Sequence, residues 1–374
     1  MKHILMATAA SFAVFATGAA AGGIERSTQS AMVLFERGNH LELTFSHVSP
    51  SVSGTSTAAS PTVPGIMAPG ANSGNMAKSY SQVGFAYKHK FSDKLSAAII
   101  YDTPYGANVD YPVPTGYFNQ AAQAEINSTS ITGLLKYTTA SNFSVYGGLR
   151  YQSMEATAAV PIIGGYTIAT SKDYSTGYVL GAAYEKPEIA LRVALTYNSG
   201  IDHTVITSER IGGGVAVYRN LDFKTPESFN LEFQSGVNKN TLVFGSIRYV
   251  KWEQFDLRPL TYLGATGNSI VSYSDNVITY NLGVGRKIND TWSAALTLGY
   301  EKSNGGFSAN LGPTDGNLSI GLGGSYTKGN MKITAGVKYV DIGDAQTTLD
   351  DVHAASNFTN NHAIGVGFKI AYSF

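Results

Sequence analysis

The chain ends on the run Asn360-Asn361-His362-Ala363-Ile364-Gly365-Val366-Gly367-Phe368-Lys369-Ile370-Ala371-Tyr372-Ser373-Phe374. From Ile364 to Phe374 every second residue is large and apolar, and the residues between them are small or polar. Successive side chains of a β-strand point to opposite faces. The run therefore predicts a strand with one apolar face, suited to contact with lipid, and one face of small and polar side chains.

The same alternation recurs along the chain from residue 39 onward. We count fourteen such runs of about ten residues each, which begin near Asn39, Ala77, Lys94, Ala124, Asn142, Lys172, Glu188, Thr225, Asn240, Ser272, Asp290, Gly316, Asn330 and Asn360. Short and long connections alternate strictly between the runs, as they do when one end of a membrane barrel has tight turns and the other has long loops. Eleven of the 12 prolines fall in the connections, and Pro226 lies at the start of a run; proline is excluded from central strands. The prediction is an all-β fold, a 14-stranded antiparallel transmembrane β-barrel over residues 39–374.

Composition favours the same fold. Only 14% of the residues are charged, Gly and Tyr are abundant with 41 and 23 residues, and cysteine is absent. After the first residues no segment approaches the roughly 18 consecutive apolar residues of a membrane helix. A soluble β-sandwich is the alternative, but it requires two stacked sheets with covered edges. The aromatic last residue, Phe374, also resembles the carboxy-terminal pattern of outer-membrane barrels.

The first 21 residues have the features of a secretory signal peptide. A basic start at Lys2 is followed by an apolar run from Ile4 to Ala16 and by small residues that end at Ala21. The apolar run is too short for the roughly 30 Å hydrocarbon core of a membrane. We therefore predict cleavage near Ala21, export, and location in the bacterial cell outer membrane.

Several functional classes lack support in the sequence. The 26 basic and 26 acidic residues balance, which argues against nucleic acid as a partner. The seven histidines include no pair at metal-ligand spacing, so no metal is expected, and no G-x-S-x-G motif occurs. A serine, a histidine and an acid from separate strands remain possible, but no such set is recognisable. We predict that the chain is not an enzyme and needs no cofactor.

Charged residues on the inward faces of the runs are the first candidates for a binding site. The register directs into the lumen Lys136, Arg150, Arg192, Arg248, Lys332, Lys338 and Lys369, against Glu42, Glu232 and Glu301. The excess of basic residues predicts attraction of an anionic headgroup such as a carboxylate, with Arg150, Arg192 and Arg248 as the candidate substrate-binding residues. The alternative is that these residues pair with the glutamates or with water and simply fill the barrel.

Residues 22–38 precede the first run and are too mixed for a strand. We predict that they form a small plug inside the barrel, which includes Arg26 and Arg37. The apolar residues Met32, Val33, Leu34 and Phe35 would contact apolar residues of the lumen, and Met32, Leu34 and Phe35 join the candidate substrate-binding residues. The alternative is a loose tail at the periplasmic end.

One long motif connects the chain to a known family. The stretch Thr225-Pro226-Glu227-Ser228-Phe229-Asn230-Leu231, followed by Tyr249, Trp252 and Phe255, resembles the T-P-x-x-x-N-L and Y-x-x-W-x-x-F strand pair of the FadL/TodX family of outer-membrane long-chain fatty acid and hydrocarbon transporters. The stretch from Val48 to Gly54 resembles the family as well. The plug differs, because it lacks the Asn-Pro-Ala motif that is usual near its end.

The resemblance implies a monomeric passive transporter. In this family extracellular loops catch the substrate, which enters an apolar pocket and leaves through a lateral opening in the wall when the plug shifts. We therefore expect passive outer-membrane transport of long-chain fatty acids or similar hydrophobic compounds, with outer-membrane lipid, lipopolysaccharide and a hydrophobic small molecule as partners. A general diffusion porin for small polar solutes is the alternative, although a porin has a wet, charged constriction. An adhesive surface protein is a third possibility.

Overall fold

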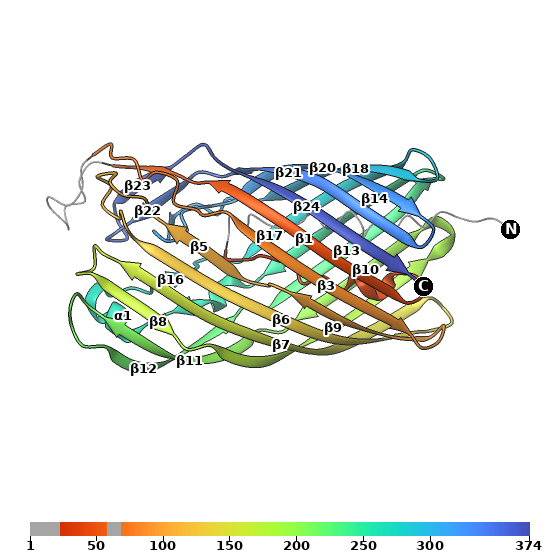
Figure 1. The fold of residues 1–374 in the computed structure, drawn as a ribbon, viewed down its shortest axis with the longest axis horizontal. Helices are drawn as coiled ribbons and strands as arrows, with labels where there is room; N and C mark the ends of the chain where they lie inside the picture. The colour runs from red at the N-terminus through yellow and green to blue at the C-terminus, as the bar shows by residue number, and fades with distance from the viewer. Residues whose placement is uncertain (1–22, 58–68) are drawn as a thin grey trace.

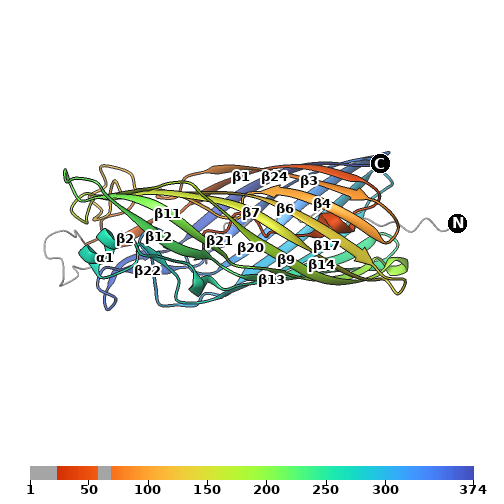
Figure 2. The same ribbon diagram turned by 90° about the horizontal axis from the view of Figure 1, so that it is seen from below.

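The computed structural model describes residues 23–57 and 69–374, so the predicted signal peptide lies outside the described residues. Within that part of the chain, fourteen antiparallel strands follow one another around a barrel and close on themselves through the pairing of the last with the first (Figures 1 and 2). The predicted barrel is confirmed. Its strands are β1 (His40–Ser51), β3 (Tyr80–Lys90), β4 (Leu95–Asp102), β6 (Gln123–Thr138), β7 (Phe143–Val160), β9 (Asp173–Lys186), β10 (Leu191–Asn198), β13 (Ser228–Asn238), β14 (Thr241–Val250), β17 (Val277–Lys287), β18 (Trp292–Glu301), β20 (Asn317–Lys328), β21 (Met331–Ile342) and β24 (Asn361–Ser373).

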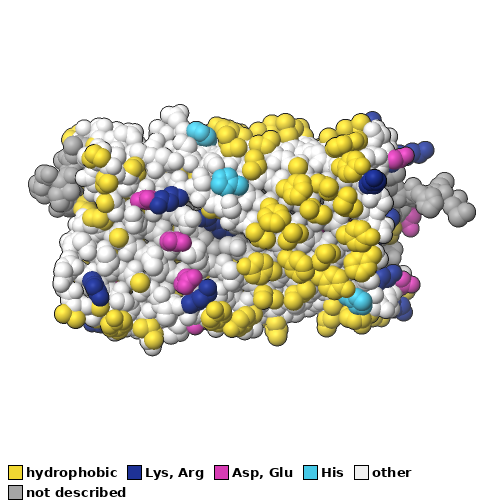
Figure 3. Space-filling view, in the orientation of Figure 1, with side chains coloured by type: hydrophobic (Ala, Val, Ile, Leu, Met, Phe, Trp, Pro, Cys, Tyr) yellow, Lys and Arg dark blue, Asp and Glu magenta, His cyan; other side chains and the backbone are white. Residues whose placement is uncertain are grey.

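The two faces of the strands lie as the alternation predicts. In β24, Ile364 and Val366 are 46% and 49% exposed on the outside, whereas Lys369 on the inner face is 4% exposed. Figure 3 shows the outward apolar side chains gathered over the half of the barrel nearer the C-terminus, while fewer of them lie on the other half of this face. The half of the barrel with the apolar outer surface lies in the membrane, because apolar side chains match a hydrocarbon environment.

The connections also alternate as predicted. Six short turns lie at one end of the barrel, which we call the turn end. The start of β1 and the end of β24 lie at the same end. At this end Asn39 and Phe374 exchange backbone hydrogen bonds of 2.9 Å in both directions. The long connections lie at the opposite end, the loop end. Outer-membrane barrels place short turns in the periplasm and long loops outside the cell.

The loop end contains more regular structure than the sequence predicted. The long connection between β7 and β9 contains strand β8 (Tyr166–Thr170), and the one between β10 and β13 contains the hairpin of β11 (Ile201–Arg210) and β12 (Val217–Thr225). The alternating residues of β11 pack against neighbours inside this extension just as barrel strands do. These strands lie beyond the lipid-facing part of the barrel, where no lipid selects an apolar outer face. Their sequences therefore look like those of ordinary loops.

Smaller elements complete the loop end. Strands β2 (Gly54–Ser56), β19 (Phe307–Ser308), β22 (Ala345–Thr348) and β23 (Ala354–Phe358) form a separate sheet. Under it, Tyr111 and Tyr117 stack with ring centroids 5.5 Å apart, and burial raises the pKa of Tyr117 to about 12. The remaining elements are β5 (Gly106–Asp110), β15 (Asp256–Leu257), β16 (Val271–Ser272), the helix α1 (Leu260–Thr266) and the 3-10 turns η4 (Pro187–Ile189) and η5 (Trp252–Gln254). None of the helices in residues 23–57 and 69–374 is long and apolar enough to cross a membrane.

Residues 23–38, which we call the N-terminal segment, run through the interior of the barrel toward the turn end. The 3-10 turn η3 (Met32–Phe35) is buried against inward-facing residues such as Leu134 and Tyr146. The ring of Phe35 meets that of Tyr146 edge-on, with centroids 5.6 Å apart. The end of the segment is held by Lys88, whose ammonium group donates to the carbonyl oxygens of Glu36 and Gly38.

Candidate functional site

The wall of the barrel is interrupted between β3 and β4. Strand β3 pairs with β1 from Tyr80 to Lys88, but its pairing with β4 covers only Phe85 to Lys90. On the loop side of Phe85 the next backbone bond between the two sides joins Lys78 N to Asn108 O at 3.0 Å. The residues of β3 between these points lack backbone partners on that side, so the sheet has a gap here.

The gap exists because the chain leaves the wall after β4. Against β6, the three residues between β4 and β5 oppose only Ser128 and Thr129, which makes an irregular inward bend. Tyr105 at the bend is 2% exposed and packs edge-on against Trp252, with ring centroids 5.9 Å apart. The N-terminal segment then binds the bend: the backbone N–H of Arg26 donates to Pro104 O and that of Gly106 donates to Ile24 O, both at 2.8 Å. The segment thus takes the place that β3 would occupy.

A cavity of about 180 Å³ lies at this gap, and we call it the wall cavity. Its inner lining includes Thr44, Gln82 and Met32, which face the lumen or belong to the N-terminal segment. Its outer lining includes Val83 and Phe85, which are 46% and 38% exposed on the membrane side. The cavity therefore borders both the interior of the barrel and its lipid-facing surface.

A second cavity of about 160 Å³, the upper cavity, lies toward the loop end. It is bordered by the start of the N-terminal segment and by apolar side chains, among them Val48, Met76 and Tyr273. A third, the apolar cavity, has a volume of about 50 Å³ and lies among the extended strands and loops; it shares with the upper cavity the residues Ala124, Ile126, Val271 and Leu311. Arg26 is the residue that the linings of the upper and wall cavities have in common. The three cavities follow one another from the loop end to the gap.

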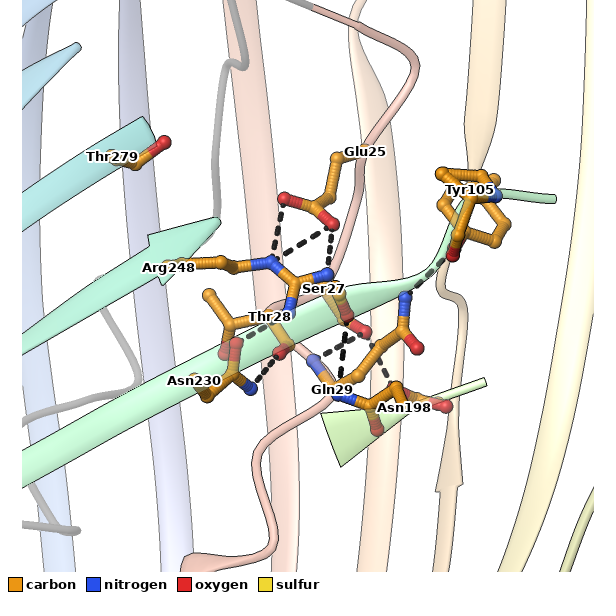
Figure 4. Close-up of polar contacts among 12 residues, drawn as sticks. Glu25, Ser27, Thr28, Gln29, Tyr105, Asn198, Asn230, Arg248 and Thr279 are labelled. Carbon is orange, nitrogen blue, oxygen red and sulfur yellow. Dashed lines mark hydrogen bonds and ion pairs between the residues drawn. The ribbon is translucent and has the colours of Figure 1, made fainter. Parts of the chain in front are cut away.

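Polar side chains of β14 and β13 bond the N-terminal segment (Figure 4). The Nε of Arg248 on β14 lies 3.1 and 3.0 Å from the two carboxylate oxygens of Glu25. Arg248 Nη1 donates to Asn230 Oδ1 at 2.5 Å, and Asn230 Nδ2 donates to the carbonyl oxygen of Thr28 at 2.8 Å. Such a charge-assisted, two-point contact is among the stronger polar interactions in proteins. These bonds hold the N-terminal segment beside the inward bend that follows β4.

Further bonds continue down the segment. Ser27 Oγ donates to Asp102 at 2.5 Å, and Ser30 Oγ donates to Glu232 at 2.7 Å. Gln29 accepts from Arg150 of β7 and donates to the hydroxyl of Tyr105 at 3.1 Å. Because the partners belong to β4, β7 and β13, the segment is joined to strands on several sides of the barrel.

The three arginines predicted to bind a headgroup all point into the barrel and are at most 5% exposed. Arg248 bonds Glu25 and Asn230, and Arg150 bonds Gln29 and Thr132. Arg192 donates to Gln234 at 2.9 Å, and its guanidinium lies 5.0 Å from the centre of the Phe35 ring. None of the three lines the wall, upper or apolar cavity. Their binding of a substrate stays a prediction.

The predicted plug residues occupy different positions. Arg26 and Met32 line the wall cavity, whereas Leu34 and Phe35 pack against the inner wall and line none of the three cavities. Arg37 is exposed at the turn end. Among the other inward charges, Lys369 and Lys136 lie 3.3 Å from Glu42 and 3.6 Å from Glu185 respectively, as the filling alternative expected.

The sequence motif is explained by these contacts, although its role was not foreseen. Asn230 bonds the N-terminal segment, and Trp252 in η5 packs so closely on the chain that a Cβ on Gly23 would lie 2.4 Å from its ring. The inward bend at Pro104 and the contact of Tyr80 with Arg26 were missed. The signal in the sequence was a proline two residues after a strand, which also fits an ordinary loop.

Within residues 23–57 and 69–374, no group of three or more His, Cys, Asp or Glu side chains is arranged to hold a metal ion. Asp102 and Glu25, whose carboxylates lie in the lumen, instead bond hydroxyl groups and an arginine of the barrel.

Comparison with known proteins supplies the family. The profile described as outer membrane protein transport protein (OMPP1/FadL/TodX) matches residues 10–374. No curated protein matches the chain. Among solved structures, a FadL homologue of Pseudomonas aeruginosa is similar with a TM-score of 0.73, 13% sequence identity and 92% of each chain covered.

Two further solved structures are similar over the whole barrel. The toluene transporter TodX of P. putida has a TM-score of 0.62, 12% identity and 91% of each chain covered. The toluene transporter TbuX of Ralstonia pickettii has a TM-score of 0.59 and 13% identity, with 91% of this chain and 90% of that chain covered. These likenesses confirm the barrel fold. Because the profile spans nearly the full chain, the protein belongs to the OMPP1/FadL/TodX family of transport proteins and is located in the bacterial outer membrane.

Proposed function

We propose that this barrel carries long-chain fatty acids or similar hydrophobic compounds passively across the outer membrane. The observation that carries the proposal is the series of three cavities that leads from the loop end to a gap in the wall. Since the last cavity is bordered by the membrane-facing Val83 and Phe85, an apolar molecule reaches lipid without crossing the polar lumen. Each CH₂ group sheltered in this way is worth about 0.8 kcal/mol relative to water. The proposal includes no catalytic step.

The N-terminal segment acts as the plug in this proposal. Its bonds to Arg248, Arg150, Asp102 and Glu232 keep it across the lumen, so polar solutes have no direct path along the barrel axis. We propose that residues 22–38 are the plug, that residues 1–21 are removed on export, and that Met32 contacts the substrate at the gap. Arg150, Arg192 and Arg248 act mainly by positioning the segment and the barrel wall, because each of them already donates to a side chain of the barrel or the segment.

The names of the solved relatives support a hydrophobic substrate. TodX and TbuX are described as toluene transporters, and a third similar structure, with a TM-score of 0.59 and 12% identity over 94% of each chain, is described as the monoaromatic hydrocarbon channel CymD. A general diffusion porin for polar solutes is disfavoured because the N-terminal segment fills the lumen. We further propose that the barrel works as a monomer among lipid and lipopolysaccharide.

The test is uptake by cells that lack their own transporter. Labelled oleate is supplied to such cells with and without this barrel in the outer membrane, and liposomes that contain the purified barrel are tested for swelling in sugar solutions. We expect restored oleate uptake and no swelling. Swelling with no gain of oleate uptake, by a barrel shown to be inserted, would favour the porin.

A further inference from the structure

Arg26 lies between the upper and wall cavities and lines both of them. It is 7% exposed, and its guanidinium carbon lies 3.1 Å from the centre of the Tyr80 ring. Its Nε donates to Gly106 O at 2.9 Å, and Gln82 donates to the Arg26 carbonyl oxygen at 3.2 Å. The side chain is therefore held by the bend on one side and by β3 on the other, across the gap in the wall.

One nitrogen of this guanidinium is left without a partner. Arg26 Nη1 is buried and makes no hydrogen bond in the part of the chain that the structure describes, and no carboxylate there forms an ion pair with Arg26. By contrast, Arg248 bonds the carboxylate of Glu25, the residue next to Arg26, with two of its nitrogens. Burying a charge without a counter-charge is costly, so a site of this kind favours an anion.

The other charges around the upper cavity are already matched. Glu25 pairs with Arg248, and Lys78 pairs with Asp110 at 2.5 Å. In the wall cavity, Glu42 pairs with Lys369, and Asp102 accepts from the hydroxyls of Ser27 and Ser130. Arg26 is thus the cation of the passage that an incoming anion can contact directly.

The surroundings of Arg26 suit an apolar tail. The upper cavity presents Val48, Val52, Met76 and Leu311 on the loop side, and the wall cavity presents Val83 and Phe85 on the membrane side. A ligand whose anionic head rests at Arg26 has apolar surface available in both directions. Such a ligand is a long-chain carboxylate rather than a neutral hydrocarbon.

We propose that Arg26 binds the carboxylate of a fatty acid in transit and makes this barrel select acids over neutral molecules with the same tail. The inference rests on the proposed function, of which it specifies the substrate class. The carboxylate accepts hydrogen bonds from Nη1, while Tyr80 and Gly106 keep the guanidinium in place. A neutral ligand leaves Nη1 unpaired and gains nothing from this residue.

The test compares two ligands with one tail. Binding of oleate and of oleyl alcohol to the purified barrel, and their uptake by cells that lack another transporter, are measured for the wild type and for Arg26→Gln. We expect the Kd of oleate to rise about tenfold, which corresponds to about 1.4 kcal/mol, and the Kd of oleyl alcohol to stay unchanged. Arg26→Lys keeps the positive charge and should retain part of the preference for oleate.

The control is Arg286→Gln, which removes an exposed arginine at the turn end that bonds Thr241. It should leave binding of both ligands as in the wild type. An equal loss of oleate and oleyl alcohol in Arg26→Gln, or no loss of either, would overturn the role of Arg26 while leaving hydrophobic transport intact. A wild-type barrel that neither binds nor moves either ligand would instead refute the proposed function.

Discussion

Individual arginines inside the barrel differ in how their charge is matched. Arg248 has the carboxylate of Glu25 and the amide oxygen of Asn230. Arg150 has only neutral partners within bonding distance, Gln29 and Thr132, and Arg26 has an unpaired nitrogen. The cost of removing one side chain follows from this difference, because a buried group that loses its partner keeps its full desolvation penalty. The inward direction of these arginines was predictable, whereas their partners were not.

The Arg248→Met variant tests the ion pair with the N-terminal segment. Loss of the guanidinium leaves the partly buried Glu25 without a cation, at a cost of up to about 3 kcal/mol. We expect the segment to detach, seen as frequent opening events in single-channel conductance and as cleavage of the segment by added protease. The matched control is Arg286→Met. The double variant Glu25→Gln with Arg248→Met should open less often than Arg248→Met alone; equal opening would contradict the pairing.

At the scale of the element, the gap in the wall is set by the point at which the pairing of β4 with β3 stops. Strands with the same alternation behave differently because the residues after Asp102 turn inward and bond the N-terminal segment instead of β3. Alternation fixes which face of a strand contacts lipid, but it carries no information on where a hydrogen-bonded ladder stops. For that reason the strand β4 was predicted and the gap beside it was not.

The Gly84→Phe variant tests the gap as the exit. Gly84 lines the wall cavity, and a Cβ there meets its nearest neighbours at an ordinary 3.6 Å, so a larger side chain fills the cavity without displacing backbone. We expect loss of most oleate uptake with normal barrel insertion. The control is Gly133→Phe, because Gly133 has open space around its Cβ. Unchanged uptake in Gly84→Phe would exclude this exit.

The Glu209→Ala variant tests how α1 is fixed at the loop end. Glu209 is fully buried and accepts bonds from Tyr166 Oη at 3.0 Å and from the backbone N–H groups of Thr261 and Tyr262 at 3.0 and 3.3 Å. Each donor left unsatisfied costs about 1–3 kcal/mol. We therefore expect hydrogen exchange of the peptide 258–270 to accelerate at least tenfold. The control Glu253→Ala changes an exposed acid of a neighbouring turn, and equal acceleration in both would refute the anchor.

At the scale of the whole molecule, the barrel encloses more space than its own side chains fill. The N-terminal segment occupies part of the remaining space. Fourteen strands surround a lumen too wide for wall side chains alone. The buried residues of η3 occupy this space at the turn half, while the linked cavities remain at the loop half. In the proposed function, the N-terminal segment closes the barrel along its axis, and the gap in the wall opens at the side.

Removal of residues 24–36 tests this division. We expect the shortened chain still to insert and to show the heat-dependent gel migration of a folded barrel, since the strands pair without the segment. Its lumen should then conduct ions continuously and admit small sugars in liposome swelling. If conductance equals that of the full-length protein, the segment does not close the lumen.

The sequence by itself determined the number and order of the barrel strands, the face each presents to lipid, and the positions of turns and long loops. These features follow from local alternation and from breaks in it, because lipid and lumen select opposite kinds of side chain at every second position. The tertiary structure alone decided the gap beside β4, the ion pair of Glu25 with Arg248, and the unpaired nitrogen of Arg26. Each of these depends on residues far apart in the chain that meet only once the barrel has closed around its N-terminal segment.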